Sequence, residues 1–120
     1  MTNVEIMDAD YIIEVQKRIC RSFVADYSPL PDDARVGVAM ETVDLIPLYG
    51  VRLEPQGNMC GWWIHGGEWS DAEDFYSPLC MMHIPRTCKF AVPFLALPVG
   101  WRFYTDGKGD FHAWLQFEDE

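Results

Sequence analysis

The chain has 120 residues, of which 49% are hydrophobic and 14% aromatic, a balance that predicts one domain over residues 1–120 with its own core and excludes intrinsic disorder. Nine basic against nineteen acidic residues give a formal net charge of -10, which disfavours nucleic-acid and anionic-membrane partners. Because no apolar run approaches the roughly 20 residues of a membrane-spanning helix and the N-terminus lacks a secretory pattern, we expect a cytoplasmic protein.

The first predicted element is an amphipathic helix. Asp8 or Asp10 is a possible N-cap for it. Since Pro29 and Pro31 cannot continue a helix, we expect it to end near Tyr27. Apolar residues recur at three- and four-residue intervals along one face, with charged residues opposite, and these apolar residues are Ile12, Val15, Ile19 and Phe23.

Short strands separated by turns follow. Residues 36–40 alternate in a way that predicts a half-buried strand. Residues 45–53 are apolar but interrupted by Pro47 and Gly50, which indicates a bent or edge strand. Residues 59–65 predict a further strand, ended by two glycines.

The second half of the chain continues this pattern. Residues 70–73 fit a capping box with weak apolar support, so a single helical turn is expected. Residues 79–84 predict a strand bounded by prolines. The best strand signal is a closing hairpin of residues 101–104 and 111–117, with Phe111, Ala113, Leu115 and Phe117 on one face. The predicted fold is α+β, a mostly antiparallel β-sheet with the N-terminal helix packed on one face.

Four cysteines and three histidines raise the question of a metal site. Structural zinc sites use two pairs of ligands, each pair separated by two to four residues. The best candidate pair is Cys80 with His83, and Cys88 and Cys60 would be distant further ligands. One pair is insufficient, so we expect buried, reduced thiols, no metal site and no disulfide framework.

The sequence contains no motif for nucleophilic catalysis, phosphate binding or dinucleotide binding. Cys60 could meet His65 or His83 only through the tertiary fold. The carboxylate pairs at 32–33 and 73–74 lie in polar, turn-like segments, which are typical of solvated charge. The sequence therefore predicts a protein that is not an enzyme, with no catalytic residues and no cofactor.

Adjacent tryptophans mark the predicted strand at residues 59–65. Trp62 and Trp63 must point to opposite faces, because successive side chains of a strand alternate. One is expected in the core, and the other is either covered by the helix or exposed as an interface anchor. The tryptophans could also line a small-molecule pocket.

Acidic residues are concentrated in one block. Between Leu53 and Pro85 there is no Lys or Arg, so the carboxylates there produce a local negative field. Such a field steers a basic protein partner toward itself. The acidic residues of this block are Glu54, Glu68, Asp71, Glu73 and Asp74.

Residues 50–114 are dense in glycine, proline and tryptophan, in an order that resembles the immunity-protein-like family of bacterial polymorphic toxin systems. The resemblance covers about residues 36–114 and implies a small α+β protein, encoded beside a toxin, that binds and neutralises it in the producing cell. The most specific segments are Gly50-Val51-Arg52, Glu54-Pro55-Gln56-Gly57-Asn58, Cys60-Gly61-Trp62-Trp63, Leu95-Ala96-Leu97-Pro98 and Gly100-Trp101-Arg102-Phe103.

Resemblance and charge together predict a binding module that neutralises a toxin with a basic surface. The alternative is a small regulatory or ligand-binding domain with a pocket between sheet and helix. The residues expected to contact the toxin are Glu68, Trp69, Asp71, Glu73, Asp74 and Trp63.

Overall fold

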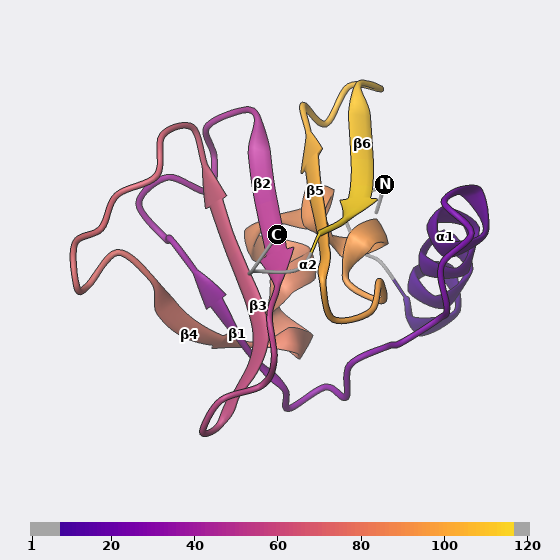
Figure 1. Ribbon diagram of the computed structural model, residues 1–120, viewed down its shortest axis with the longest axis horizontal. Coiled ribbons are helices and arrows are strands. Elements are labelled where there is room, and N and C mark those ends of the chain that lie inside the picture. The colour runs from indigo at the N-terminus through magenta and orange to yellow at the C-terminus, as the bar shows by residue number, and fades with distance from the viewer. Residues whose placement is uncertain (1–7, 117–120) are drawn as a thin grey trace, which may run out of the picture.

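A single six-stranded sheet organises the protein. The computed structural model describes residues 8–116, and its strands lie in the order β4-β1-β3-β2-β5-β6 (Figure 1). β1 and β3 are parallel and the other four neighbouring pairs are antiparallel, which confirms the predicted α+β class. The strands are β1 (Arg35–Val38), β2 (Leu48–Arg52), β3 (Met59–Gly66), β4 (Ser77–Cys80), β5 (Trp101–Thr105) and β6 (Phe111–Leu115).

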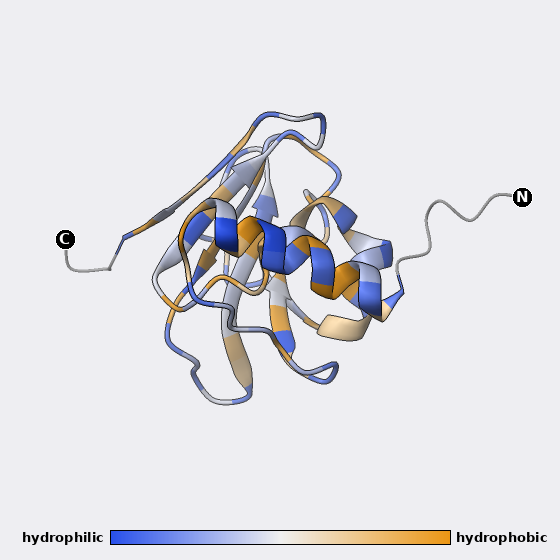
Figure 2. Ribbon diagram, turned by 90° about the vertical axis from the view of Figure 1, so that its right-hand side faces the viewer, coloured by the Kyte–Doolittle hydropathy of each residue, from blue (hydrophilic) through white to orange (hydrophobic). Residues whose placement is uncertain are grey.

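The N-terminal helix α1 (Ala9–Ser22) begins at Asp8, the first of the two predicted caps. The Asp8 side chain accepts a hydrogen bond from the Tyr11 amide at 2.8 Å. Hydrophilic and hydrophobic residues alternate along α1 (Figure 2). Its buried face includes Gln16, whose Nε2 donates to the Val92 carbonyl at 3.1 Å. The helix therefore packs on the segment that contains Val92, which in turn covers the sheet.

A backbone motif ends α1 earlier than predicted. Val24 has a φ of 56°, in the left-handed region that is rare for a β-branched residue. The Val24 amide donates to the Arg21 carbonyl, and the Ala25 amide donates to the Cys20 carbonyl at 2.8 Å. This closing turn satisfies the last carbonyls of the helix, so the predicted end near Tyr27 is wrong.

Strand β2 is central in the sheet and not at an edge. It lies between β3 and β5, so the edge position predicted for residues 45–53 is wrong. Pro47 comes just before the strand, where its missing N–H removes no ladder hydrogen bond. Gly50 is needed inside the strand, because a Cβ there would clash with the Phe103 ring.

Residues 81–94 form a helical layer that the sequence did not predict. Three short elements follow β4: η1 (Met81–His83), α2 (Ile84–Thr87) and η2 (Lys89–Phe94). The strand predicted for residues 79–84 is therefore wrong after Cys80. Pro85 lies in the first turn of α2, where a missing N–H is tolerated, and so it begins a helix instead of ending a strand.

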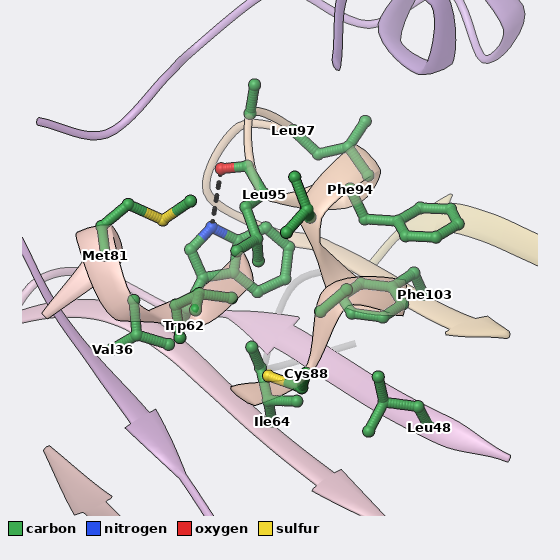
Figure 3. Close-up of a cluster of buried hydrophobic side chains, with 14 of the residues drawn as sticks. Val36, Leu48, Trp62, Ile64, Met81, Cys88, Phe94, Leu95, Leu97 and Phe103 are labelled. Carbon is green, nitrogen blue, oxygen red and sulfur yellow. Dashed lines mark hydrogen bonds between the residues drawn. The ribbon is translucent and has the colours of Figure 1, made fainter. Parts of the chain in front are cut away.

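The core fills the space between the sheet and this helical layer. Trp62 is fully buried, and its Nε1 donates to the Leu95 carbonyl at 3.1 Å (Figure 3). Phe103 lies 5.6 Å from the Trp62 ring and stacks on Phe94 at 4.5 Å between ring centroids. Other fully buried side chains of the core are Val36, Val38, Leu48, Ile64, Ile84, Val92, Leu95 and Leu97.

Arg52 joins three segments of this inner layer. Its Nη1 donates to the carbonyls of Ser28 and Leu97, each at 2.8 Å. The Arg52 carbonyl in turn accepts a hydrogen bond from the Gly100 amide at 2.7 Å. Arg52 and Leu97 lie in segments that carry the family resemblance. These segments therefore have a structural role, because they hold the sheet to the helical layer.

The closing hairpin is confirmed. β5 and β6 pair in antiparallel register, and Ala113 of β6 is buried on the inner face. Phe111 lies on the same face, with its ring 5.8 Å from that of Phe94. Phe117, expected on this face, lies outside the described residues.

Candidate partner-binding site

The outer face of the sheet, opposite the core, carries two cross-strand rows of mostly aromatic side chains. The register places Trp63, Val51, Arg102 and Trp114 side by side on β3, β2, β5 and β6. The next row, two residues along each strand, is His65, Tyr49, Tyr104 and His112. Because side chains two residues apart share a face, these eight residues form one surface.

Neighbouring rings on this surface contact one another. Tyr49 and His65 stack with their centroids 5.2 Å apart, and His112 and Trp114 stack at 5.8 Å. The Trp114 Nε1 also donates to the Gln116 side chain at 3.2 Å. Aromatic pairs at such separations are mutually stabilising, so the surface is preorganised.

The loop of residues 67–76 folds along one side of this surface. Tyr76 lies 5.1 Å from the Trp63 ring, and Phe75 lies 5.9 Å from His65. Together the loop and the sheet enclose a hollow of about 500 Å³. Its lining comprises Tyr49, Gly50, Val51, Trp63, His65, Gly67, Trp69, Tyr76, Arg102, Phe103 and Trp114.

Gly37 of β1 sets the position of Trp63. A Cβ at Gly37 would clash with the Trp63 ring, so the indole lies directly over the Gly37 backbone. The Tyr76 ring meets the same indole in an edge-to-face arrangement. Trp63 is thus half-buried and held from two sides, with its remaining surface turned to the hollow.

The loop that borders the hollow carries the predicted acidic residues. Ser70 begins a turn in which its Oγ accepts a hydrogen bond from the Ala72 amide and Phe75 closes back on Ala72. The chain does not continue into the predicted helical turn, since Phe75 and Tyr76 pack instead against His65 and Trp63 of the sheet. Four carboxylates on the loop are exposed: Glu68, Asp71, Glu73 and Asp74.

Those carboxylates are not neutralised by neighbours in the described part of the chain. The ion pairs found between residues 8 and 116 both lie on α1, where Glu14 meets Arg18 and Arg21. Of the residues that line the hollow, Arg102 is the one that carries a fixed positive charge. The loop that borders the hollow therefore carries exposed carboxylates, and Arg102 lies on the β5 side.

Burial changes the acid–base behaviour of two groups in the hollow. Desolvation lowers the pKa of His65 below 6.5, which favours the neutral ring at neutral pH. Desolvation raises the pKa of Tyr76, opposed in part by a hydrogen bond from the Trp69 side chain. Both rings are therefore uncharged at pH 7.

The structure brings the sequence-predicted contact residues to one region. Trp63 and Trp69 both line the hollow, and the four carboxylates lie on the loop that forms its side. Trp69 is 61% exposed, which makes it available to a partner. The sequence did not point to Tyr49, His65, Tyr76 or Arg102 as part of this surface, although strand alternation in β3 was a usable signal for His65. Trp114 had been considered only as one of the tryptophans that could line a small-molecule pocket.

The residues considered for other chemistry do not gather. Between residues 8 and 116 no group of three or more His, Cys, Asp or Glu could hold a metal ion. All four thiols are free, and burial raises the pKa of Cys88 to about 12, which leaves it protonated at neutral pH. The space between sheet and helical layer is filled by the core, so the hollow lies on the face opposite to the pocket expected there.

Comparison with known families assigns the chain to a protein family. A family model described as the Imm33-like domain matches residues 15–116. The chain belongs to the Imm33-like family. Family membership extends the resemblance noted above to include most of α1, and it places the protein in an immunity-protein family, for which a toxin partner and no enzymatic activity are the general expectation.

Two further comparisons, and a search of the described residues for membrane-spanning helices, found no match. Neither a curated protein nor a solved structure matches this Imm33-like chain. Within residues 8–116, no helix combines the length and apolar character that crossing a bilayer requires.

Proposed function

We propose that this Imm33-like protein neutralises a cognate bacterial toxin by binding it stoichiometrically in the cytoplasm of the producing cell. The toxin would present a basic surface to the acidic loop of residues 67–76. The contact residues are those of the loop and its adjoining strand: Glu68, Trp69, Asp71, Glu73, Asp74 and Trp63.

One observation carries this proposal: an exposed tryptophan lies among exposed carboxylates on the loop that borders an aromatic hollow. Protein interfaces draw most of their binding energy from a few aromatic and arginine anchors. Surrounding charge contributes more to the rate of association and to the choice of partner. Trp69, 61% exposed, fits the first role and the four loop carboxylates fit the second.

The test uses the product of the neighbouring open reading frame as the candidate toxin. We expect the two proteins to co-purify in a one-to-one complex. Charge reversal of the loop, E68K/D71K/E73K/D74K, is expected to slow association about tenfold or more at low salt, and less at high salt because ions screen the field. Stopped-flow kinetics at two ionic strengths measure this effect.

A matched control separates local charge from net charge. Asp26, Asp32, Asp33 and Glu54 are also exposed, and they lie outside the loop. The variant D26K/D32K/D33K/E54K has the same change in net charge and is expected to retain most of the wild-type association rate. Equal slowing of the two variants, or of neither, contradicts the placement of the site.

The hollow itself favours a second candidate, a ligand-binding or regulatory domain. Its volume of about 500 Å³ is within the range of small-molecule sites, which is roughly 300–1,000 Å³. In that case a small metabolite would raise the melting temperature of the wild-type protein in a dose-dependent manner. The Trp63→Ala variant would lose this shift.

A further inference from the structure

The corner of the hollow formed by Trp63, Trp69 and Tyr76 has the features of a receptor for a positively charged side chain. The Trp63 and Tyr76 rings meet edge to face at 5.1 Å, and Trp69 borders the same space from the loop. Aromatic faces attract a cation within about 6 Å of the ring centroid, and tryptophan attracts it most strongly.

Charge around this corner has one sign. Glu68 is adjacent to Trp69 in the chain, and Asp71, Glu73 and Asp74 follow on the same loop, all exposed. Carboxylates on the same short loop as Trp69 contribute to the electrostatic field at this corner, because surface charges interact over about a Debye length, 8–10 Å. His65 is neutral at pH 7, so it adds no opposing charge.

Arg102 divides the hollow into two ends. The register Trp63, Val51, Arg102 puts two strand spacings, about 10 Å, between Arg102 and Trp63. A cation is favoured at the loop end, near Trp63, because the exposed carboxylates lie on the loop that borders this end. The occupant of the corner must be a slender basic group that reaches in from outside, as the Lys or Arg side chain of a protein does.

We propose that Trp63, Trp69 and Tyr76 form an aromatic socket that receives one lysine or arginine side chain of the toxin. The proposal rests on the function proposed above and names the group that the site recognises. The loop carboxylates draw the basic surface in, and the socket fixes its register by holding a single side chain against the indoles.

The experiment uses the full chain labelled with ¹⁵N and three small probes of equal length: n-butylammonium, n-butylguanidinium and n-butanol. The indole Nε1–H signals of the five tryptophans are followed by NMR. We expect both cations to shift the Trp63 and Trp69 signals with millimolar dissociation constants. The signal of the buried Trp62 is expected to stay in place, and neutral butanol to bind at least about fivefold more weakly.

Two variants and one control sharpen the result. Trp69→Ala, at an exposed position that does not threaten folding, is expected to weaken both cations about fivefold. The neutralised loop E68Q/D71N/E73Q/D74N should weaken the cations at low salt and leave butanol unchanged. Tyr11→Ala removes another exposed aromatic, 55% exposed on α1, and should leave cation binding as in the wild type.

Three results overturn the socket: butanol binding as tightly as the cations, shifts centred on Trp114 instead of Trp63 and Trp69, or no shift at 100 mM probe. A preference for one of the two cations identifies lysine or arginine as the occupant. Since no toxin is present, failure of this experiment is distinguishable from failure of the proposed function, which the co-purification experiment tests by itself.

Discussion

Trp62 and Trp63 are consecutive residues of β3, and they belong to different parts of the molecule. The Trp62 ring lies in the core, fully buried and hydrogen-bonded to Leu95. The Trp63 ring lies on the outer face, half-buried, between the Gly37 backbone and Tyr76. The pleat of one strand thus places one indole in the core and the other at the proposed contact surface.

On each face of the sheet a glycine makes room for an aromatic ring. Gly50 makes room for the Phe103 ring on the inner face, and Gly37 makes room for the Trp63 ring on the outer face. The inner ring has Phe94 stacked on its other side, so it cannot move away. The Trp63 ring on the outer face borders an open hollow, which gives it space to shift. The inner face is therefore expected to respond to substitution with lost stability, and the outer face with altered binding.

Alanine at each of the two tryptophans gives the largest expected difference. Trp62→Ala should lower the free energy of unfolding by about 3–5 kcal/mol, the range for a large buried aromatic residue. Trp63→Ala should lower it by about 1–2 kcal/mol, since its ring is half-buried, while weakening the toxin complex. Urea denaturation and a binding isotherm measure the two quantities. An equal loss of stability in both variants would show that the outer face is part of the core.

Alanine at the two glycines tests the same contrast with smaller changes. Gly50→Ala forces the Phe103 ring against Phe94 and is expected to cost about 1–3 kcal/mol. Gly37→Ala pushes the Trp63 ring toward the hollow and is expected to cost less than Gly50→Ala, with a change in tryptophan fluorescence. Thermal unfolding compares the two. A larger drop in melting temperature for Gly37→Ala would contradict the assignment of an adaptable outer face.

Cys88 provides a measure of burial on the inner side. Burial raises the pKa of its thiol from 9.0 to about 12. Because the unfolded chain releases the proton first, this thiol contributes stability that is fully present below pH 9 and is lost as pH rises toward 12. At pH 10 the loss is on the order of 1 kcal/mol.

Unfolding by urea at pH 8 and pH 10, for the wild type and for Cys88→Ala, isolates this contribution. The variant starts from a lower stability because of the cavity it creates, but it should lose less between the two pH values. Identical losses in both proteins would mean that Cys88 ionises as freely in the folded state as in the unfolded one.

The pKa of His65 provides a measure of burial on the outer face, with a smaller expected effect than that of Cys88. Desolvation beneath the 67–76 loop lowers its pKa, so its NMR titration midpoint should fall below 6.5. The unfolded chain takes up the proton first as pH falls, so His65 contributes stability above pH 6.5 that is lost as pH falls through the folded pKa. Tyr49→Ala removes the ring stacked on His65 and should return the midpoint toward 6.5. An unchanged midpoint would place the desolvation elsewhere.

Local pattern was sufficient for much of this fold. The apolar repeat and Asp8 predicted the start of α1, and alternation predicted β1, β3 and the β5–β6 hairpin. Trp62 and Trp63 were expected on opposite faces because a strand alternates, and they are. The acidic, aromatic loop was recognised as a candidate contact region from composition alone.

The failures share a physical cause. Residues 81–94 are apolar without a clear period, so nothing local distinguishes a strand from short helical turns that are buried on the sheet. The central place of β2 depends on pairing with β3 and β5, which are distant in sequence from each other. Pro47 and Gly50 wrongly indicated an edge strand. Pro47 comes just before the strand begins, and Gly50 makes room for the Phe103 ring, and both reasons lie in the tertiary structure.

By itself the sequence determined the class of fold, the net negative charge and the pair of tryptophans that face apart, because these follow from composition and from the two-residue period of a strand. The family was indicated separately, by the resemblance of particular segments. Only the tertiary structure decided where the outer face becomes hollow. Trp63, Tyr76 and Arg102 come from separate segments, and their positions depend on strand register and on a loop folding back across the sheet. Long-range register is set by packing, which no short stretch of residues encodes.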